Sequence, residues 1–308
     1  MSTLAPIRAA MQTDRGLVRD HNEDFVDKWE PATREAEAQS GWLYIVADGV
    51  GGAEAGEVAS QYATQQAKHH YLNNNGEANL GQRLLQALHA ANTDLRQLVA
   101  ERDMNKRMAT TMVATVIHGQ RAFIANVGDS RGYHWRDNEL RQITKDQSLV
   151  AKLLEEGAIT ADEAANHPHK NVILYSIGSE RTPQIDLFEF LVQPGDKIVL
   201  CSDGLTRHLS DAEISQIVAQ SDLDAAATQL IKLANERGGQ DNISAAIVEY
   251  GVQETAAKQT AAQPATQVIQ RSKPLPRRAT KAFMIPYTLF LSLVETVLIV
   301  LVWLLLRV

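Results

Sequence analysis

The chain has 308 residues, of which 44% are hydrophobic and 22% charged, and its formal net charge is −7. This composition is typical of a globular protein and excludes a fully disordered, collagen-like or polytopic membrane protein. The acidic balance argues against a general nucleic-acid binder, and a single cysteine excludes a disulfide framework and a cysteine-rich zinc site.

Five short apolar runs in the first 252 residues predict buried strands, with helical patterns between them. The predicted strands are Trp42–Ala47, Met112–Ile117, Ala122–Val127, Lys197–Cys201 and Ile243–Tyr250. The predicted helices are Glu54–Tyr71, Leu80–Arg102, Ser148–Glu156, Asp211–Ala219 and Asp224–Arg237. The segment HGQR between the second and third strands suits a hairpin. Long helices mixed with consecutive hairpin strands predict antiparallel sheets covered by helices.

The composition changes after residue 252. From 253 to 281 six basic residues accompany one acidic residue, and Gln, Ala, Thr and Pro are frequent. Such a segment, with little apolar periodicity, predicts a flexible linker. Its basic residues could bind anionic lipid headgroups or serve only to solubilise the segment and set its topology.

The segment 282–308 is apolar apart from Glu295 and Arg307. Tyr287–Leu306 reaches the ~20 residues that a membrane-spanning helix needs, and Tyr287 and Trp303 suit the two interfaces. We expect a single-pass helix, with the N-terminal domain in the cytoplasm because basic residues precede the span. A buried or interfacial helix is the alternative. Glu295 is expected either to be protonated or to contact a partner helix.

Acidic side chains lie next to several predicted strands. The pairs are Asp48-Gly49, Gly128-Asp129, Asp203-Gly204 and Asp241-Asn242. One such pair is an ordinary turn signal, but acidic residues at the ends of several strands can converge at the rim of a sheet. Converging carboxylates repel unless a cation compensates, and without His or Cys they favour Mg²⁺ or Mn²⁺ over Zn²⁺. We therefore predict a multi-carboxylate divalent-metal centre.

Seven motifs occur in the order VRDHNED, VADGVGG, MATT, NVGDSR, TKDQS, SDG and GGQDN. Together they resemble the type 2C metal-dependent protein phosphatases, especially the compact bacterial members, over residues 8–250. The resemblance implies an α+β fold, a four-layer αββα sandwich of two antiparallel sheets flanked by helices, with a two-metal cleft at one edge. The apolar tail adds one expected C-terminal transmembrane helix.

The resemblance also implies a protein serine/threonine phosphatase that uses two or three Mn²⁺ or Mg²⁺ ions. The resemblance places Asp48 between both ions as a bridging ligand, with the Gly49 carbonyl on one ion and Asp203 and Asp241 on the other. It places Glu23 and Asp24 on metal-bound waters. It places Asp129, together with Asp203, at a weaker third metal site. Arg19 matches the family's phosphate-binding arginine. Two neighbouring ions can activate a water and clamp the attacking and leaving oxygens, and an arginine offers a planar fork to phosphate.

The expected organisation is a catalytic domain at 1–252, a basic linker at 253–281 and a membrane anchor at 282–308. The expected partners are phosphorylated proteins, substrates of a serine/threonine kinase, and the membrane, with no nucleic acid. The expected location of the domain is the cytoplasmic face of a bacterial inner membrane, where a tether raises the effective concentration of the enzyme near its substrates.

The sequence departs from the family pattern in four places. These are Val50 in place of the histidine of eukaryotic members, Ala109-Thr110-Thr111 in place of Gly-Thr-Thr, Asp146-Gln147 in place of Asp-His, and Leu174-Tyr175 in the flap. The missing histidine moves protonation of the leaving group to a metal-bound water or another group. The flap change affects substrate contacts rather than the metal core.

Two other functions compete with this interpretation. Cys201 and Arg207 have the Cys-x5-Arg spacing of tyrosine phosphatases, although Asp203 between them would place negative charge in a phosphate-binding loop. A membrane-tethered pseudophosphatase or binding module is the second alternative, favoured by the altered flap and the missing histidine.

Overall fold

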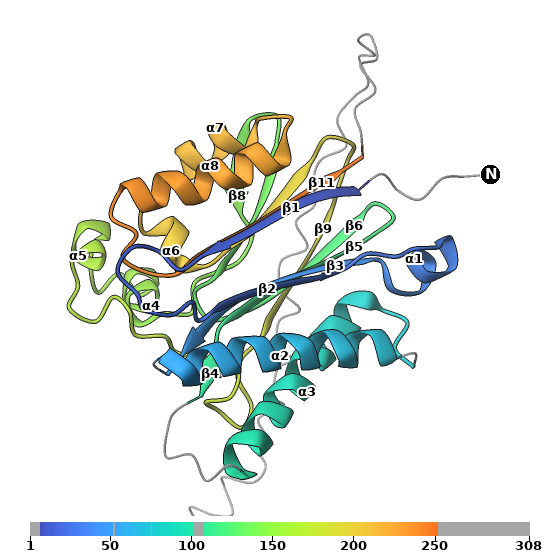
Figure 1. The fold of residues 1–308 in the computed structure, drawn as a ribbon, viewed down its shortest axis with the longest axis horizontal. Helices are drawn as coiled ribbons and strands as arrows, with labels where there is room; N and C mark the ends of the chain where they lie inside the picture. Colours follow the sequence, from blue (N-terminus) through green and yellow to red (C-terminus); the bar gives the residue numbers. More distant parts are fainter. Residues whose placement is uncertain (1–6, 52, 75, 102–107, 252–308) are drawn as a thin grey trace, which may run out of the picture. The chain divides into compact units, whose positions relative to one another are not determined.

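Two antiparallel sheets lie face to face in this protein (Figure 1). The computed structural model describes residues 7–51, 53–74, 76–101 and 108–251. The first sheet consists, in spatial order, of β1 (Ile7–Asp14), β11 (Ile243–Tyr250), β10 (Lys197–Cys201), β7 (Arg131–Arg136) and β8 (Glu139–Gln142). The second consists of β2 (Asp24–Trp29), β3 (Trp42–Val50), β5 (Met112–His118), β6 (Arg121–Val127) and β9 (Asp186–Leu191), with β4 (Ala109–Thr110) paired to the end of β3.

A pair of helices covers the outer face of each sheet (Figure 1). The second sheet carries α2 (Ala53–Asn73) and α3 (Leu80–Glu101), and the first carries α7 (Asp211–Val218) and α8 (Leu223–Glu236). The shorter helices are α1 (Arg34–Ser40), α4 (Leu149–Glu155), α5 (Ala161–Ala165) and α6 (Asp203–Thr206). The order of layers is helix, sheet, sheet, helix, which confirms the expected αββα sandwich.

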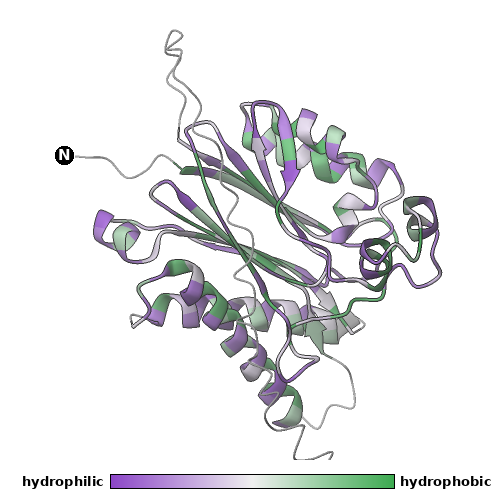
Figure 2. Cartoon of the chain, turned by 180° about the vertical axis from the view of Figure 1, so that it is seen from behind, coloured by the Kyte–Doolittle hydropathy of each residue, from purple (hydrophilic) through white to green (hydrophobic). Residues whose placement is uncertain are grey.

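Strand β3 explains why the strand sequences are apolar throughout. Leu43 and Ile45 belong to the core beneath α2 and α3, whereas Tyr44 and Val46 belong to the core between the two sheets. A strand whose two faces are both covered reads as a continuous apolar run. Figure 2 shows the consequence, with mostly hydrophobic strands inside and helices that carry bands of both hydrophilic and hydrophobic residues.

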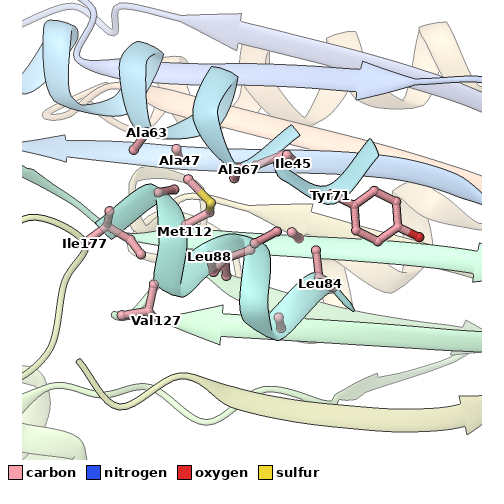
Figure 3. Packing of buried hydrophobic residues seen from close by; sticks show 14 of the residues in the cluster. Ile45, Ala47, Ala63, Ala67, Tyr71, Leu84, Leu88, Met112, Val127 and Ile177 are labelled. Carbon is pink, nitrogen blue, oxygen red and sulfur yellow. The ribbon is translucent and has the colours of Figure 1, made fainter. Parts of the chain in front are cut away.

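Helix α2 packs on the sheet through small side chains. Its buried face carries alanine at 55, 59, 63 and 67, followed by Tyr71, and a spacing of four residues places these on one side of a helix. Figure 3 shows Ala63 and Ala67 beside Ala47 and Ile45 of β3. The Tyr71 hydroxyl donates to the Ser40 carbonyl at 2.7 Å, so the one polar atom of this stripe is paired.

The predicted elements before residue 252 are all present. Each of these ten elements starts and ends within three residues of its predicted bounds. In the predicted hairpin, His118 pairs with Arg121, which leaves a two-residue turn with Gly119 at φ 55°. A positive φ at this place is what tight hairpin turns require.

The predicted linker at 253–281 and the predicted membrane segment at 282–308 lie outside the described residues. Within the part of the chain that the structure describes, no helix combines the length and the apolar composition needed to cross a bilayer. The division of the chain into three segments therefore stays a prediction.

Candidate metal centre

Carboxylates from both sheets meet at one end of the sandwich. Asp24 of β2 lies directly opposite Asp48 of β3 in the antiparallel register. Asp203 lies two residues after the end of β10, and Asp241 two residues before the start of β11; these are neighbouring strands of the other sheet. The Ser202 hydroxyl donates to Oδ2 of Asp24 at 2.8 Å, so the two sheets are joined at this point.

The electrostatics of these groups show that they share one site. Burial raises the pKa of Asp48 well above its usual range, and the charges of Asp24, Asp203, Asp129 and Asp241 raise it further. Burial, together with neighbouring carboxylates, likewise raises the pKa of Asp203, that of Asp24 to about 7 and that of Asp129 to about 6. Several buried like charges at one place are unfavourable unless positive charge compensates them.

Three of these carboxylates carry an oxygen with no hydrogen-bond partner. The atoms are Oδ1 of Asp24, Oδ1 of Asp129 and Oδ1 of Asp203, and each is fully buried. A buried acceptor without a donor is strongly unfavourable. Carboxylate oxygens are also the ligands that Mg²⁺ and Mn²⁺ prefer. The donor set therefore fits divalent cations, as the sequence predicted.

Two arginines supply positive charge at the other carboxylate oxygens. The Arg207 guanidinium contacts Asp203 and also bonds Oδ2 of Asp241 at 3.0 Å, while Arg19 lies 2.9 Å from Oδ1 of Asp241. Among the residues that the structure describes, no three His, Cys, Asp or Glu side chains already form a ligand cluster. The two arginines thus bind one oxygen of Asp203 and both oxygens of Asp241, whereas Oδ1 of Asp203 has no hydrogen-bond partner.

Threonine side chains and backbone groups fix the position of Asp48. The Asp48 carbonyl accepts from the Thr111 N–H at 2.8 Å and from the Thr110 hydroxyl at 2.8 Å. The Thr111 hydroxyl in turn lies 2.7 Å from that of Ser130, the residue after Asp129. The motif Ala109-Thr110-Thr111 therefore links the positions of Asp48 and Asp129, and its first residue does not enter these contacts.

Asn242 connects three segments of the site, a role that the sequence did not reveal. Its Oδ1 accepts from the Glu23 N–H at 2.8 Å, and its Nδ2 donates to the carbonyls of Arg15 and His21 at 2.9 and 2.8 Å. Its own N–H donates to Oδ1 of Asp241 at 3.0 Å. The amide thereby holds the loop that carries Arg19 and Glu23 against the strand that follows Asp241.

Two of the glycines next to the acidic residues are required by close backbone packing. A Cβ at Gly49 would lie 2.2 Å from the Gly56 carbonyl oxygen, and one at Gly204 would lie 2.0 Å from that of Asn242. Since real Cβ atoms do not approach so closely, only glycine fits at either position. These glycines let the segments that carry Asp48, Asp203 and Asp241 pack against their neighbours without a gap.

The other predicted site residues also lie here. Glu23 is buried, and its carbonyl accepts from the Gly49 N–H at 3.0 Å, which places it beside Asp48. Burial raises the pKa of Glu23, and the Arg19 charge opposes this rise. Arg19 itself has a side chain that is 47% exposed, so its guanidinium lies at the rim of the site, where a phosphate can reach it.

The comparisons with known proteins decide the family. A sequence profile of the family described as protein phosphatase 2C matches residues 21–247. The chain belongs to the protein phosphatase 2C family.

Relatives of this phosphatase cover the described domain almost completely. The serine/threonine phosphatase stp of Listeria innocua is 37% identical over 248 residues, which are 79% of this chain and 96% of that protein. The solved structure of the Mycobacterium tuberculosis phosphatase PstP/Ppp has a TM-score of 0.70 at 35% identity and covers 80% of this chain and 99% of that one. A solved PstP catalytic domain in complex with two manganese ions has a TM-score of 0.67 at 36% identity, covering 80% and 98%.

Gln147, which departs from the family motif, has a structural role in this phosphatase. It is buried, its Oε1 accepts from the Gly128 N–H at 2.8 Å, and its Nε2 donates to Oδ2 of Asp186 at 2.9 Å. It therefore positions the turn that carries Asp129. Val50, which replaces the histidine of eukaryotic members, is 39% exposed and supplies no proton donor.

The cysteine-based alternative is wrong. Cys201 is completely buried, and burial raises the pKa of its thiol to about 12. Nucleophilic cysteines need an accessible thiolate of lowered pKa. Arg207, the arginine of the supposed Cys-x5-Arg loop, binds two carboxylates instead of lining a phosphate cradle.

Proposed function

We propose that this phosphatase hydrolyses phosphoserine and phosphothreonine in proteins with water activated by two, or with the site at Asp129 three, Mn²⁺ or Mg²⁺ ions. The observation that carries the proposal is the group of buried carboxylates from two sheets, three of which have an unpaired oxygen. The related PstP domain binds two manganese ions. This relative supports the same cofactor here.

We propose a role for each side chain from the family resemblance and from its position. Asp48, half-buried beside the other carboxylates, is proposed to bridge the ions with help from the Gly49 carbonyl, while Asp203 and Asp241 would ligate on the side of β10 and β11. The buried acids Glu23 and Asp24 would orient water molecules, and Asp129 with Asp203 would form the third site. The ions, when bound, would lower the pKa of a water and stabilise the charge on the phosphate.

Arg19 is proposed to bind the phosphate of the substrate. Its guanidinium is exposed at the rim and is held by Asp241 alone among the described acidic side chains. A planar guanidinium can place two parallel N–H donors on phosphate oxygens. Substrate binding would therefore draw Arg19 from Asp241 toward the phosphoester.

Metal removal tests the proposed chemistry. The purified full chain should release phosphate from a phosphothreonine peptide with Mn²⁺ present, lose this activity in EDTA, and regain it when Mn²⁺ is added in excess. Equal rates in EDTA and in Mn²⁺ would reject the metal mechanism. No turnover in Mn²⁺ despite bound metal would favour the pseudophosphatase alternative.

We also propose that the chain is anchored in a membrane by 282–308, with the phosphatase domain on the cytoplasmic side and a serine/threonine kinase at the same membrane supplying its substrates. The support is the apolar length of 287–306 and the excess of basic residues before it. A reporter fused after Val308 should therefore be found outside the cytoplasm. A cytoplasmic reporter signal would contradict the proposed topology.

A further inference from the structure

Arg207 bridges two acidic side chains that come from different strands of the first sheet. Its Nη2 contacts Oδ2 of Asp203, and its Nη1 lies 3.0 Å from Oδ2 of Asp241. Asp203 and Asp241 are the two residues proposed to ligate the same metal ion. One arginine thus binds one oxygen of each of these two carboxylates.

The backbone of Arg207 keeps the guanidinium close to Asp203. Arg207 is the C-terminal cap of α6, and its N–H donates to the Asp203 carbonyl at 2.9 Å. The two residues are four positions apart, a spacing that brings side chains together on a helix. The side chain is 34% exposed, so part of it faces solvent.

The arginine compensates only part of the negative charge. Oδ1 of Asp203 and Oδ1 of Asp129 remain buried without a hydrogen-bond partner although Arg207 is in place. Arg207 therefore satisfies the outer oxygens of the site and leaves the inner ones to another cation. The positive charge of Arg207 therefore lies beside a carboxylate, Asp203, that still has an oxygen without a partner.

We propose that Arg207 is an internal counter-cation of the metal centre, which neutralises Asp203 and Asp241 in the metal-free enzyme and lowers the affinity of the centre for divalent cations. The proposal rests on the proposed metal site. A guanidinium beside these carboxylates would repel a cation bound to them, so the binding energy of the ion would be reduced by that repulsion.

The test compares the Mn²⁺ affinity of Arg207→Gln with that of Arg237→Gln in the full chain, measured by isothermal titration calorimetry after chelation. Arg237 is a matched control, because its side chain is 39% exposed and it binds Glu213 and the His208 carbonyl rather than Asp203 or Asp241. We expect Arg207→Gln to bind Mn²⁺ at least about tenfold more tightly, and Arg237→Gln to stay within about twofold of wild type. Unchanged affinity in Arg207→Gln, or an equal gain in both variants, would overturn the proposal.

Thermal melting gives a second measurement, which distinguishes a counter-cation from an arginine that only stabilises the fold. Arg207→Gln should lower the melting temperature in EDTA, where the carboxylates lose their counter-charge, and should leave it unchanged in saturating Mn²⁺. A similar fall in both conditions would mean that Arg207 only stabilises the fold. If the wild-type chain binds no Mn²⁺, the proposed function is rejected. If the wild type and Arg207→Gln bind Mn²⁺ equally tightly, only the proposed role of Arg207 is rejected.

Discussion

The Asp48→Asn variant should hydrolyse a phosphothreonine peptide at least about a thousandfold less efficiently, in kcat/KM, than the wild-type phosphatase. Asp48 lies opposite Asp24 in the strand register. The negative charges of Asp203, Asp129 and Asp241 raise its pKa. Asparagine keeps the shape of the side chain but removes the charge that would bind two cations. Saturating Mn²⁺ should not restore the rate, because the bridging ligand is gone.

The same substitution should not unfold the metal-free enzyme. Burial and the neighbouring carboxylates raise the pKa of Asp48, which means that the ionised side chain destabilises the folded state. The melting temperature of Asp48→Asn in EDTA should therefore equal or exceed that of the wild type. Asp224→Asn, an exposed change in the first turn of α8, serves as the control and should keep full activity. Normal activity in Asp48→Asn would disprove the assigned bridge.

The Asp196→Ala variant should lower the free energy of unfolding by about 3 kcal/mol. Asp196 is only 2% exposed and accepts from Nε of Arg136 at 2.8 Å, from Nε2 of His134 at 2.9 Å and from the Gln193 N–H at 2.8 Å. Alanine would leave these donors without an acceptor in a largely buried place. Urea denaturation of the variant and the wild type in the same buffer measures the difference.

The contribution of Asp196 to the free energy of unfolding should decrease as the pH falls. Burial would raise the pKa of this carboxyl, but the hydrogen bonds from Arg136 and His134 outweigh it and hold the pKa below the usual range. A carboxyl with a lowered folded-state pKa stabilises the fold above its unfolded value of about 4, and the contribution is lost as the pH falls through the folded value. Asp196 lies at the opposite end of β10 from Asp203, so the Mn²⁺ affinity of Asp196→Ala should equal that of the wild type.

A decrease in the free energy of unfolding of less than about 1 kcal/mol in Asp196→Ala at pH 7 would contradict the role of this network.

The sequence predicted best the elements that are buried on both faces. β3 and β11 read as continuous apolar runs because helices cover one face and the other sheet covers the second. The strands that were missed include β1, β2, β8 and β9, which lie at the sheet edges. Their polar residues face solvent or the site, as in DFVDKW of β2, so apolar content alone could not identify them.

The acidic turns were sufficient to predict that these carboxylates meet, whereas the polar network around them could not be predicted. The pairing of Asp24 with Asp48 depends on the register of β2, a strand that the sequence pattern did not indicate. Ser202 and Asn242 act through hydrogen bonds to Asp24 and to Glu23, which are 178 and 219 residues away in the chain. Such contacts follow from the packed fold and leave no periodic signal.

Arg207 shows how a local motif can mislead. Its spacing from Cys201 suggested a phosphate-binding loop, but the short helix α6 turns its side chain toward Asp203 and Asp241. A Cys-x5-Arg pattern carries chemistry only if the chain between the two residues wraps around an anion. Here that chain contains Asp203, an acidic residue of the candidate metal centre.

The most direct test of the account is the number of Mn²⁺ ions bound per chain, measured by electron paramagnetic resonance during titration of the chelated protein. We predict two tightly bound ions in the wild type, with any third ion weaker, and the loss of tight binding in Asp48→Asn. A wild-type chain that binds no Mn²⁺, or an Asp48→Asn variant that binds the ions as tightly as the wild type, would contradict a metal centre built on these carboxylates.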